Sequence, residues 1–432
     1  MVLAVAPVAQ TDAGQLLTFL VQIGVFLGAA LLLGQLARRV GLPGIVGELS
    51  AGVLLGPSLL GVVAPGAFAR LIPGGHAPLL DGVGQFGVLL LVGVTGAHLD
   101  LTVVRRHRWA VCCVGTGGLV LPLAFGVVTG LILPAALLGP GVDRTVFAAF
   151  LGVALCVSAI PVIGSTLLEL RLLHRDIGQL IITAAAVEDV VGWLLLSVVG
   201  AMATTGVAAG HLGTAVGSLA LVLVATVALR PVVNRSLRWA ARKTEPGVSV
   251  VVTVLLVVLA AAGTQAVGLE PVLGAFLCGI LIGSSGWLEP TRLAPLRTFV
   301  LAVLAPLFFA TAGLRTDLGA LARPPVAAAA GLVLVVAVVG KFAGAYLGGR
   351  LARLRPWPAL ALGAGLNARG VIEVIIAMVG LRLGVFSPAM YTVVVLVAIG
   401  TSVMAPPMLR YTTRRIPVTD QEQARERALS LS

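Results

Sequence analysis

The chain has 432 residues, of which 59% are hydrophobic and 11% are charged, whereas soluble domains carry roughly 25% charged residues. This composition excludes a water-soluble fold. The formal net charge is +12, but the basic residues stand in short clusters between apolar runs and not on one face, so no nucleic-acid partner is indicated.

The apolar runs are long enough to cross about 30 Å of hydrocarbon, and they predict an all-α polytopic membrane protein. We expect 13 transmembrane helices embedded in the lipid bilayer. In chain order the predicted spans cover residues 14–36, 41–61, 79–97, 110–133, 145–167, 177–203, 208–230, 248–266, 269–287, 295–314, 326–350, 357–383 and 387–410.

The distribution of Lys and Arg predicts the orientation of the chain. An odd number of spans places the two termini on opposite sides of the membrane. Loops after the odd-numbered spans, together with the C-terminal tail, hold 22 of the 29 Lys and Arg residues, and the other loops hold five. Because cytoplasmic loops are enriched in these residues, we expect a multi-pass plasma-membrane protein with the N-terminus outside and the C-terminus in the cytoplasm.

Two stretches of the sequence resemble each other. Residues 49–58, LSAGVLLGPS, align with residues 276–285, FLCGILIGSS, and Gly52 then matches Gly279. The end of the third predicted span recurs in the same way at the end of the tenth. The matched residues there are Gly96 with Gly313, Asp100 with Asp317, and Leu101 with Leu318.

The matched stretches lie seven spans apart, and because seven is odd the second copy must cross the membrane in the opposite sense. We therefore expect one transporter domain, residues 1–410, that contains two inverted six-helix repeats at about 14–203 and 248–410. A linker helix at about 208–230 joins them, and residues 411–432 form a short cytoplasmic tail. Inverted repeats are typical of secondary transporters. Close helix packing is the alternative explanation for the matched glycines.

Few ionisable side chains fall inside the predicted spans, and the first of them is Glu48 in the second span. A charge at the bilayer centre costs about 2.5 to 3.5 kcal/mol even on a lenient scale, so each such residue is a functional candidate. Glu48 is expected near the cytoplasmic start of its helix, where the helix dipole stabilises an acid. The sequence favours this capping role over a role in ion access.

The fifth predicted span reads ALCVSAIPVIGSTLLEL. Pro161 near its centre has no backbone N–H to donate and crowds the preceding turn. The helix is therefore expected to kink or break between Ser158 and Pro161. A single proline kink without any ligand is the alternative, because membrane helices tolerate such kinks.

The sixth predicted span carries the strongest signal, TAAAVEDVVGW, which places Glu188 and Asp189 side by side near mid-membrane. Neighbours on a helix point about 100° apart. One carboxylate can therefore face an ion site while the other faces a partner on another helix. Lys341, midway along the eleventh span, is the expected charge partner. A buried ion-pair network that only holds helices together is the alternative.

The twelfth predicted span reads ALGAGLNARGVIEV, and Gly363, Gly365 and Gly370 weaken it at the place that corresponds to the fifth span. Two interrupted helices that cross at the midplane expose free carbonyl and N–H groups. Such groups suit cation coordination, but the facing helix dipoles need compensation. Arg369 and Glu373, one turn apart, are expected to supply it.

Motifs for other chemistry do not occur in the sequence. There is no HExxH, CxxC or GxxxxGK[ST] pattern, so zinc chemistry and nucleotide-driven pumping are not indicated. We expect a protein that is not an enzyme and that uses no cofactor.

Taken together, these motifs resemble the monovalent cation:proton antiporter-2 family, part of the cation/proton antiporter superfamily with the sodium/proton exchanger fold. The similarity extends over about residues 14–410 in collinear blocks. The blocks are GELSAGVLLGPS at 47–58, SAIPV at 158–162, AAAVEDVVGW at 184–193, LGAFLCGILIG at 273–283, PLFFATAGLRTDL at 306–318, GKFAGAYLGGRL at 340–351 and GLNARGVIEVII at 365–376.

The resemblance implies a homodimer in which a core domain moves like an elevator against a dimerisation domain. The core would consist of the fourth to sixth and eleventh to thirteenth spans. The resemblance also implies that Asp189 is the carboxylate that binds the transported monovalent cation and the proton, with Glu188 at a variable position beside it. Lys341 would pair near this site, and Ser158 and Pro161 would lie in an unwound segment.

We therefore expect a secondary active transporter that exchanges Na⁺ or K⁺ for H⁺ through competition at a buried carboxylate. Two alternatives stay open from the sequence. One is a sodium-coupled symporter for an organic solute, and the other is a pH-gated cation channel or sensor.

Overall fold

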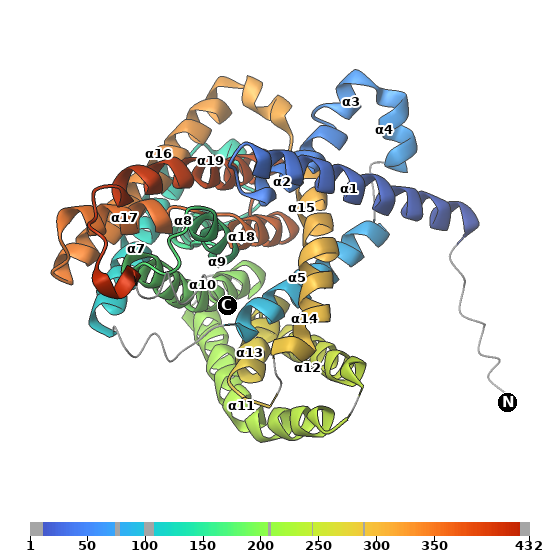
Figure 1. Cartoon of the computed structure of the whole chain (residues 1–432). Helices are drawn as coiled ribbons and strands as arrows, with labels where there is room; N and C mark the ends of the chain where they lie inside the picture. The colour runs from blue at the N-terminus through green and yellow to red at the C-terminus, as the bar shows by residue number, and fades with distance from the viewer. Residues whose placement is uncertain are drawn as a thin grey trace.

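The structure is a computed structural model that describes residues 12–73, 78–98, 108–205, 209–243, 245–287 and 290–423 (Figure 1). Within these ranges the regular elements are helices, with one isolated antiparallel bridge between Leu138 and Phe386. The α-helices are α1 (Ala13–Arg39), α2 (Gly44–Leu55), α3 (Leu60–Val63), α4 (Pro65–Leu71), α5 (Pro78–Ala97), α7 (Arg108–Ile132), α8 (Arg144–Cys156), α9 (Ile160–Glu169), α10 (Asp176–Thr205), α11 (Ala209–Ala241), α12 (Pro246–Ala266), α13 (Pro271–Gly283), α14 (Pro290–Phe299), α15 (Ala305–Leu314), α16 (Pro324–Leu351), α17 (Pro356–Leu366), α18 (Val371–Arg382) and α19 (Pro388–Thr413).

Shorter helical segments complete the described part of the chain. A π-helical segment, Val300–Leu304, joins α14 to α15, and 3₁₀ turns occur at Ala135–Leu137 and Leu318–Ala322. The tenth predicted span is therefore built from α14, the π segment and α15. Some residues used in the sequence argument lie outside the described ranges, namely Asp100 and Leu101 of the repeat and Arg105, Arg106, Arg425 and Arg427 of the basic loops and tail.

Eleven helices in the described ranges are long and apolar enough to cross a membrane, and the bent pair α17–α18 makes twelve. Each corresponds to one of the predicted spans. The remaining prediction, residues 269–287, corresponds to α13, which has only 13 residues, whereas a full crossing needs about 20. The multi-span membrane architecture is thus established, and the count of thirteen stays a prediction.

The helices form two groups in space (Figure 1). The first group contains α7 to α10 and α16 to α19. The second group contains α1, α2, α5 and α15 and lies beside the first, to its right in the view. In the first group α7 packs against α8 and α16, and α17 packs against α16 and α19. In the second group α2 packs against α1 and α15, and α5 packs against α15. Outside these two groups, α13 packs against α5 and α12. The first group consists of the fourth to sixth and eleventh to thirteenth predicted spans.

Close backbone contacts connect the helices that carry the repeated sequence. A Cβ atom added to Gly52 of α2 would overlap the carbonyl oxygen of Ala310 in α15, and one added to Gly279 of α13 would overlap that of Gly93 in α5. Gly52 and Gly279 are the residues that the repeat pairs with each other. An internal repeat predicts this correspondence, in which α2 contacts α15 as α13 contacts α5. Close packing of helices at small residues would produce the same contacts. The inverted repeat remains a prediction.

The start of the C-terminal tail folds back onto the connection between α9 and α10. Glu422 is 3% exposed, lies 3.1 Å from Arg175 Nε and accepts a hydrogen bond from the Asp176 N–H at 2.8 Å. Arg175 also donates to the carbonyl oxygens of Ile416 and Pro417, at 3.1 and 3.2 Å. These contacts bind the tail to the end of the membrane domain.

Candidate ion-binding site

Two helices are interrupted, each within a predicted span. α8 ends at Cys156 and α9 begins at Ile160, after extended backbone at Val157 and Ala159. Pro161 lies in the first turn of α9, where a missing N–H is tolerated, although it cannot continue the preceding helix. The second interruption separates α17 from α18, and these two helices are bent by 45°.

The two interruptions are hydrogen-bonded to each other. The Ala159 N–H donates to the carbonyl oxygen of Ala368 at 3.1 Å, and Ser158 Oγ lies 2.6 Å from the carbonyl oxygen of Leu366. A Cβ atom added to Gly370 would come within 2.7 Å of Val162 in α9. The structure therefore brings the two broken helices into direct contact, and we call this region the crossing.

Glu188 of α10 lies at the crossing and is paired. Its Oε2 atom is 2.7 Å from Lys341 Nζ and 2.6 Å from Ser158 Oγ. Lys341 also donates to two backbone carbonyl oxygens, at 3.0 and 2.6 Å. Glu188 and Lys341 are 0% exposed. The first of the two adjacent acids is thus the one that holds the lysine.

Asp189 has different surroundings from its neighbour. It is 0% exposed, and neither carboxylate oxygen has a hydrogen-bond partner among the described residues. Buried polar atoms in proteins are nearly always hydrogen-bonded, and an unpaired buried charge carries a penalty of several kcal/mol. The described part of the chain thus places a carboxylate beside the crossing without a hydrogen-bond donor, which is the arrangement expected of a site that binds a cation or a proton.

Lys341 and Arg369 neutralise the end of α8. Lys341 donates to the carbonyl oxygen of Cys156 at 2.6 Å, and Arg369 donates to that of Ala154 at 3.3 Å. Both acceptors lie in the last turn of α8, where carbonyl groups lack helical partners and the helix dipole is negative. Arg369 also donates to Ala337 of α16 at 3.1 Å. The broken helix therefore ends against two positive charges, one of them the Arg369 predicted for charge compensation.

Glu373 lies one turn beyond Arg369 in α18. One of its oxygens is 3.6 Å from Arg369 Nη1, but neither oxygen makes a hydrogen bond within the described part of the chain. The residue is 1% exposed. Glu373 is therefore a second acid at the crossing whose charge is only loosely paired.

Glu48 lies apart from these residues. It is in the second turn of α2, near the start of the helix as expected, but the first turn carries no acid, so its role as a cap stays a prediction. Its nearest cation is Arg38 of α1, with Nη1 3.9 Å from Oε1. The structure brings Ser158, Glu188 and Lys341 together and leaves Glu48 outside the group.

Two further residues at the crossing were not singled out from the sequence. Asn367 is 0% exposed and neither side-chain polar atom has a partner in the described chain. Gly118 of α7 accepts a hydrogen bond from Lys341, and a Cβ atom there would collide with Glu188 Oε1. A carboxamide inside an interrupted membrane helix was the available signal for Asn367. The fit of Gly118 depends on tertiary contacts alone.

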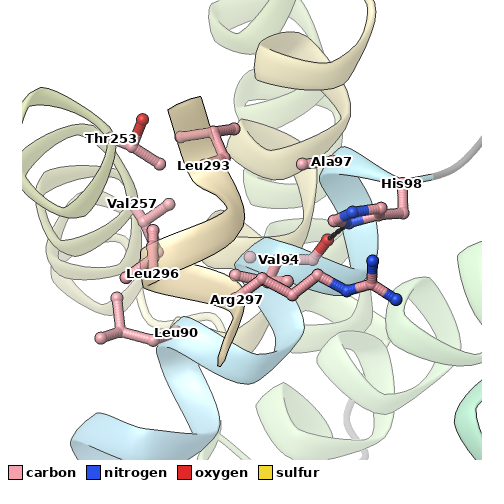
Figure 2. A pocket seen from close by; sticks show the side chains of 10 residues that line it. Leu90, Val94, Ala97, His98, Thr253, Val257, Leu293, Leu296 and Arg297 are labelled. Atoms are coloured by element: carbon pink, nitrogen blue, oxygen red, sulfur yellow. Dashed lines mark hydrogen bonds between the residues drawn. The ribbon is translucent and has the colours of Figure 1, made fainter. Parts of the chain in front are cut away.

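A small pocket lies elsewhere, between α5, α12 and α14 (Figure 2). Its lining is mostly apolar, and the His98 ring at its rim lies 2.7 Å from the Val94 carbonyl oxygen. None of the predicted ion-site residues lines it. This pocket is therefore not the candidate site.

Comparison with known proteins gives a consistent result. The family described as sodium/hydrogen exchanger, transmembrane, matches residues 25–415. The Na⁺/H⁺ antiporter NhaS4 of Synechocystis sp. is 30% identical over 400 residues, which cover 92% of this chain and 98% of that protein. The Na⁺/H⁺-K⁺ antiporter GerN of Bacillus cereus is 27% identical, with 91% of this chain and 96% of that protein covered.

A plant relative and a solved structure are also similar. Cation/H⁺ antiporter 20 of Arabidopsis thaliana is 29% identical over 90% of this chain, which spans 47% of that protein. The structure of the sodium proton antiporter MjNhaP1 from Methanocaldococcus jannaschii has a TM-score of 0.65, 14% identity, and coverage of 93% of this chain and 97% of that one. The two proteins therefore share a fold.

Proposed function

Because the chain belongs to the sodium/hydrogen exchanger family, we propose that it exchanges one monovalent cation, Na⁺ or K⁺, for one proton through competition at Asp189. The similar proteins described as Na⁺/H⁺ and Na⁺/H⁺-K⁺ antiporters support exchange of this kind. The observation that carries the proposal is the buried Asp189 carboxylate, whose two oxygens have no partner in the described chain.

The charge balance of the crossing supports competition. Among the described residues, five acidic and basic side chains are buried there, the acids Glu188, Asp189 and Glu373 and the bases Lys341 and Arg369. With all five ionised, the group has a net charge of −1. One proton or one monovalent cation neutralises it, and both together would leave it positive. Because net charge is costly in a low-dielectric interior, the group favours one ligand or the other.

The same balance couples binding to movement. We propose that α7 to α10 and α16 to α19 form the core domain, which moves as an elevator against the remaining helices in a homodimer. A loaded, neutral core crosses the bilayer far more readily than an empty core with a charge of −1. The empty core therefore stays on the side where it released the cation until a proton binds. Net transport of a cation thus requires a proton to bind in its place. Glu188 and Lys341 stay paired throughout, and Arg369 and Lys341 keep the end of α8 neutral.

The protein would lie in the plasma membrane with its N-terminus outside and its C-terminus in the cytoplasm, as the excess of Lys and Arg in one set of loops predicts. The proton gradient would then drive cation extrusion.

Transport by reconstituted protein tests the proposal. Addition of Na⁺ or K⁺ to proteoliposomes with a transmembrane pH gradient is expected to move protons. Asp189→Asn should abolish this proton movement, because an amide neither ionises nor binds a proton near neutral pH. Asp143→Asn is the matched control, since Asp143 caps α8 outside the crossing through a bond to the Thr145 N–H and asparagine caps equally well.

Two outcomes would contradict the proposal. Unchanged exchange by the Asp189 variant would remove the carboxylate from the mechanism. Cation flux through the wild-type protein without proton movement would favour the channel that the sequence left open.

A further inference from the structure

Asn367 lies in the interruption between α17 and α18, fully buried, with both amide atoms unpaired in the described chain. A carboxamide has two donor hydrogens and an acceptor oxygen. Leaving such a group unpaired in the interior destabilises the protein, because the group loses its hydrogen bonds to water and gains none in exchange. The position therefore carries a polar side chain at a cost to stability that needs a reason.

The usual structural reasons for an asparagine at a helix end do not apply here. Asn367 has φ −72° and ψ −13°, so it does not adopt the left-handed conformation that asparagine tolerates at helix ends. The Asn367 backbone N–H, and not the side chain, bonds to the Gly363 carbonyl oxygen at 3.1 Å, and the Ala368 N–H bonds to the Gly365 carbonyl oxygen at 3.2 Å. The local backbone would accept most other residues.

The place of Asn367 in the crossing suggests the reason. The residue before it, Leu366, has its carbonyl oxygen 2.6 Å from Ser158 Oγ, and the residue after it, Ala368, accepts a hydrogen bond from Ala159. Ser158 in turn lies 2.6 Å from a Glu188 oxygen. Asn367 is therefore fixed on both sides to the interruption that adjoins the two acids.

The carboxamide oxygen of Asn367 is a neutral ligand, whereas the carboxylates of Glu188 and Asp189 are charged when they bind a cation. Alkali cations are coordinated by oxygen atoms, and the number and strength of neutral oxygen dipoles affect the preference between Na⁺ and K⁺. A neutral ligand leaves the charge balance of the crossing unchanged. It also does not bind a proton near neutral pH, so it favours the cation in the competition at Asp189.

We propose that Asn367 Oδ1 is a ligand of the transported cation at the Asp189 site and contributes to the preference between Na⁺ and K⁺. This inference rests on the proposed function. Since Na⁺ approaches an oxygen dipole more closely than K⁺, loss of the ligand should weaken Na⁺ binding more than K⁺ binding.

Asn367→Leu is the variant of choice because leucine has a similar volume and no polar atoms. Replacing an unpaired amide by an apolar group is near neutral or stabilising, so the melting temperature in choline buffer should not fall. Asn367→Ala is a second variant in case leucine does not fit. Asn234→Leu on α11 is the matched control, because Asn234 is the other asparagine in the chain and its Oδ1 also lacks a partner in the described chain.

Three readouts are needed: the cation-induced rise in melting temperature, the half-saturating cation concentration for exchange at fixed pH, and proton uptake in choline buffer. We expect Asn367→Leu to lose most of the rise and to increase the half-saturating Na⁺ concentration about tenfold to a hundredfold, as for a lost bond to a charged group. The increase for K⁺ should be smaller. Proton uptake in choline buffer should stay as in the wild type.

The results separate this inference from the proposed function. Wild-type protein without cation-coupled proton movement would contradict the function itself. If the wild type and Asp189→Asn behave as proposed, wild-type half-saturating concentrations in the Asn367 variants would overturn the ligand role alone. An equal increase for Na⁺ and K⁺ would overturn the role in preference.

Discussion

At the scale of single residues, two adjacent acids have separate tasks because neighbours on a helix point about 100° apart. Glu188 reaches Lys341 at 2.7 Å and Ser158 at 2.6 Å. Asp189 meets no hydrogen-bond donor within the described part of the chain. The two carboxylates thus have different partners because their side chains point in different directions. In our account only Asp189 exchanges its bound ion.

The charge balance predicts an unusual pair of variants. Glu188→Gln removes one negative charge, so the crossing becomes neutral without a ligand, and exchange should fall at least tenfold. Adding Lys341→Met removes one positive charge and restores the net charge of −1. The double variant should therefore regain a substantial part of the exchange, measured in the same proteoliposomes. If the double variant is less active than Glu188→Gln alone, the pair has a role beyond charge balance.

The sequence contained part of this site. Charged residues within apolar spans identified Glu188, Asp189 and Lys341, because an ionisable group in the membrane is costly. The sequence could not tell which acid holds the lysine, since that depends on how α10 is rotated against α16. Asn367 was missed because a carboxamide has no charge to mark it. Its place in an interrupted helix was the available sequence signal, and its burial without a partner among the described residues identifies it in the structure.

At the scale of elements, a broken helix needs partners for its free end. The end of α8 is capped by Lys341 and Arg369, which belong to α16 and to the other interruption. α7 brings its backbone close to this group at Gly118. The crossing is therefore held by α7, α8, α16 and the α17–α18 interruption. A small displacement of any of these elements should change the contacts of Glu188.

Gly118→Ala tests this packing. The added Cβ would collide with Glu188 Oε1, so the variant should be destabilised by about 1 to 3 kcal/mol, as is usual for overpacking, and should exchange cations more slowly. Gly115→Ala is the control on the same helix, because a Cβ there meets its nearest neighbour at an ordinary 3.7 Å. Equal melting temperatures for the two variants would contradict the described packing.

The docked tail predicts a pH dependence of stability. Burial opposes ionisation of Glu422, but the backbone N–H groups of Thr419 and Asp176 and the Arg175 guanidinium outweigh it and hold the pKa of Glu422 below its ordinary value of 4.5. A lowered pKa contributes stability above the unfolded-state value, and this contribution is lost as the pH falls through the folded-state value.

Glu422→Gln should therefore lower the stability at pH 7 by about 1 to 3 kcal/mol, since Arg175 loses a charged partner. The difference from the wild type should shrink below about pH 4.5. Melting temperature across pH checks this, with the exposed Asp420→Asn as control. A difference that grows on acidification would contradict the ion pair.

Elements were predictable where the local signal was strong. Pro161 placed the first interruption and Gly370 the second, because proline and glycine weaken helices through the backbone itself. The other two glycines of the predicted weak segment, Gly363 and Gly365, lie inside α17. The π segment at Val300–Leu304 and the shortness of α13 had no comparable signal. The Thr419 and Glu422 pair has the spacing of a capping box, but its docking on Arg175 is a tertiary contact that no local pattern contains.

At the scale of the whole molecule, composition and family were the most predictable properties. The resemblance to cation/proton antiporters is confirmed by the family match over residues 25–415, and the membrane architecture is confirmed by at least eleven long apolar helices in the described ranges. Both follow from features spread along the entire chain. The inverted repeats, the elevator movement and the homodimer remain proposals, because they concern symmetry and motion and not composition.

The most direct test is to count the protons that cation binding releases. Purified protein in weakly buffered choline solution should release one proton for each Na⁺ or K⁺ bound, over the pH range in which Asp189 is protonated before the addition. Asp189→Asn should release none, and Asp143→Asn should release as many as the wild type. Cation binding that releases no proton, or equal release by Asp189→Asn, would contradict competition at this carboxylate.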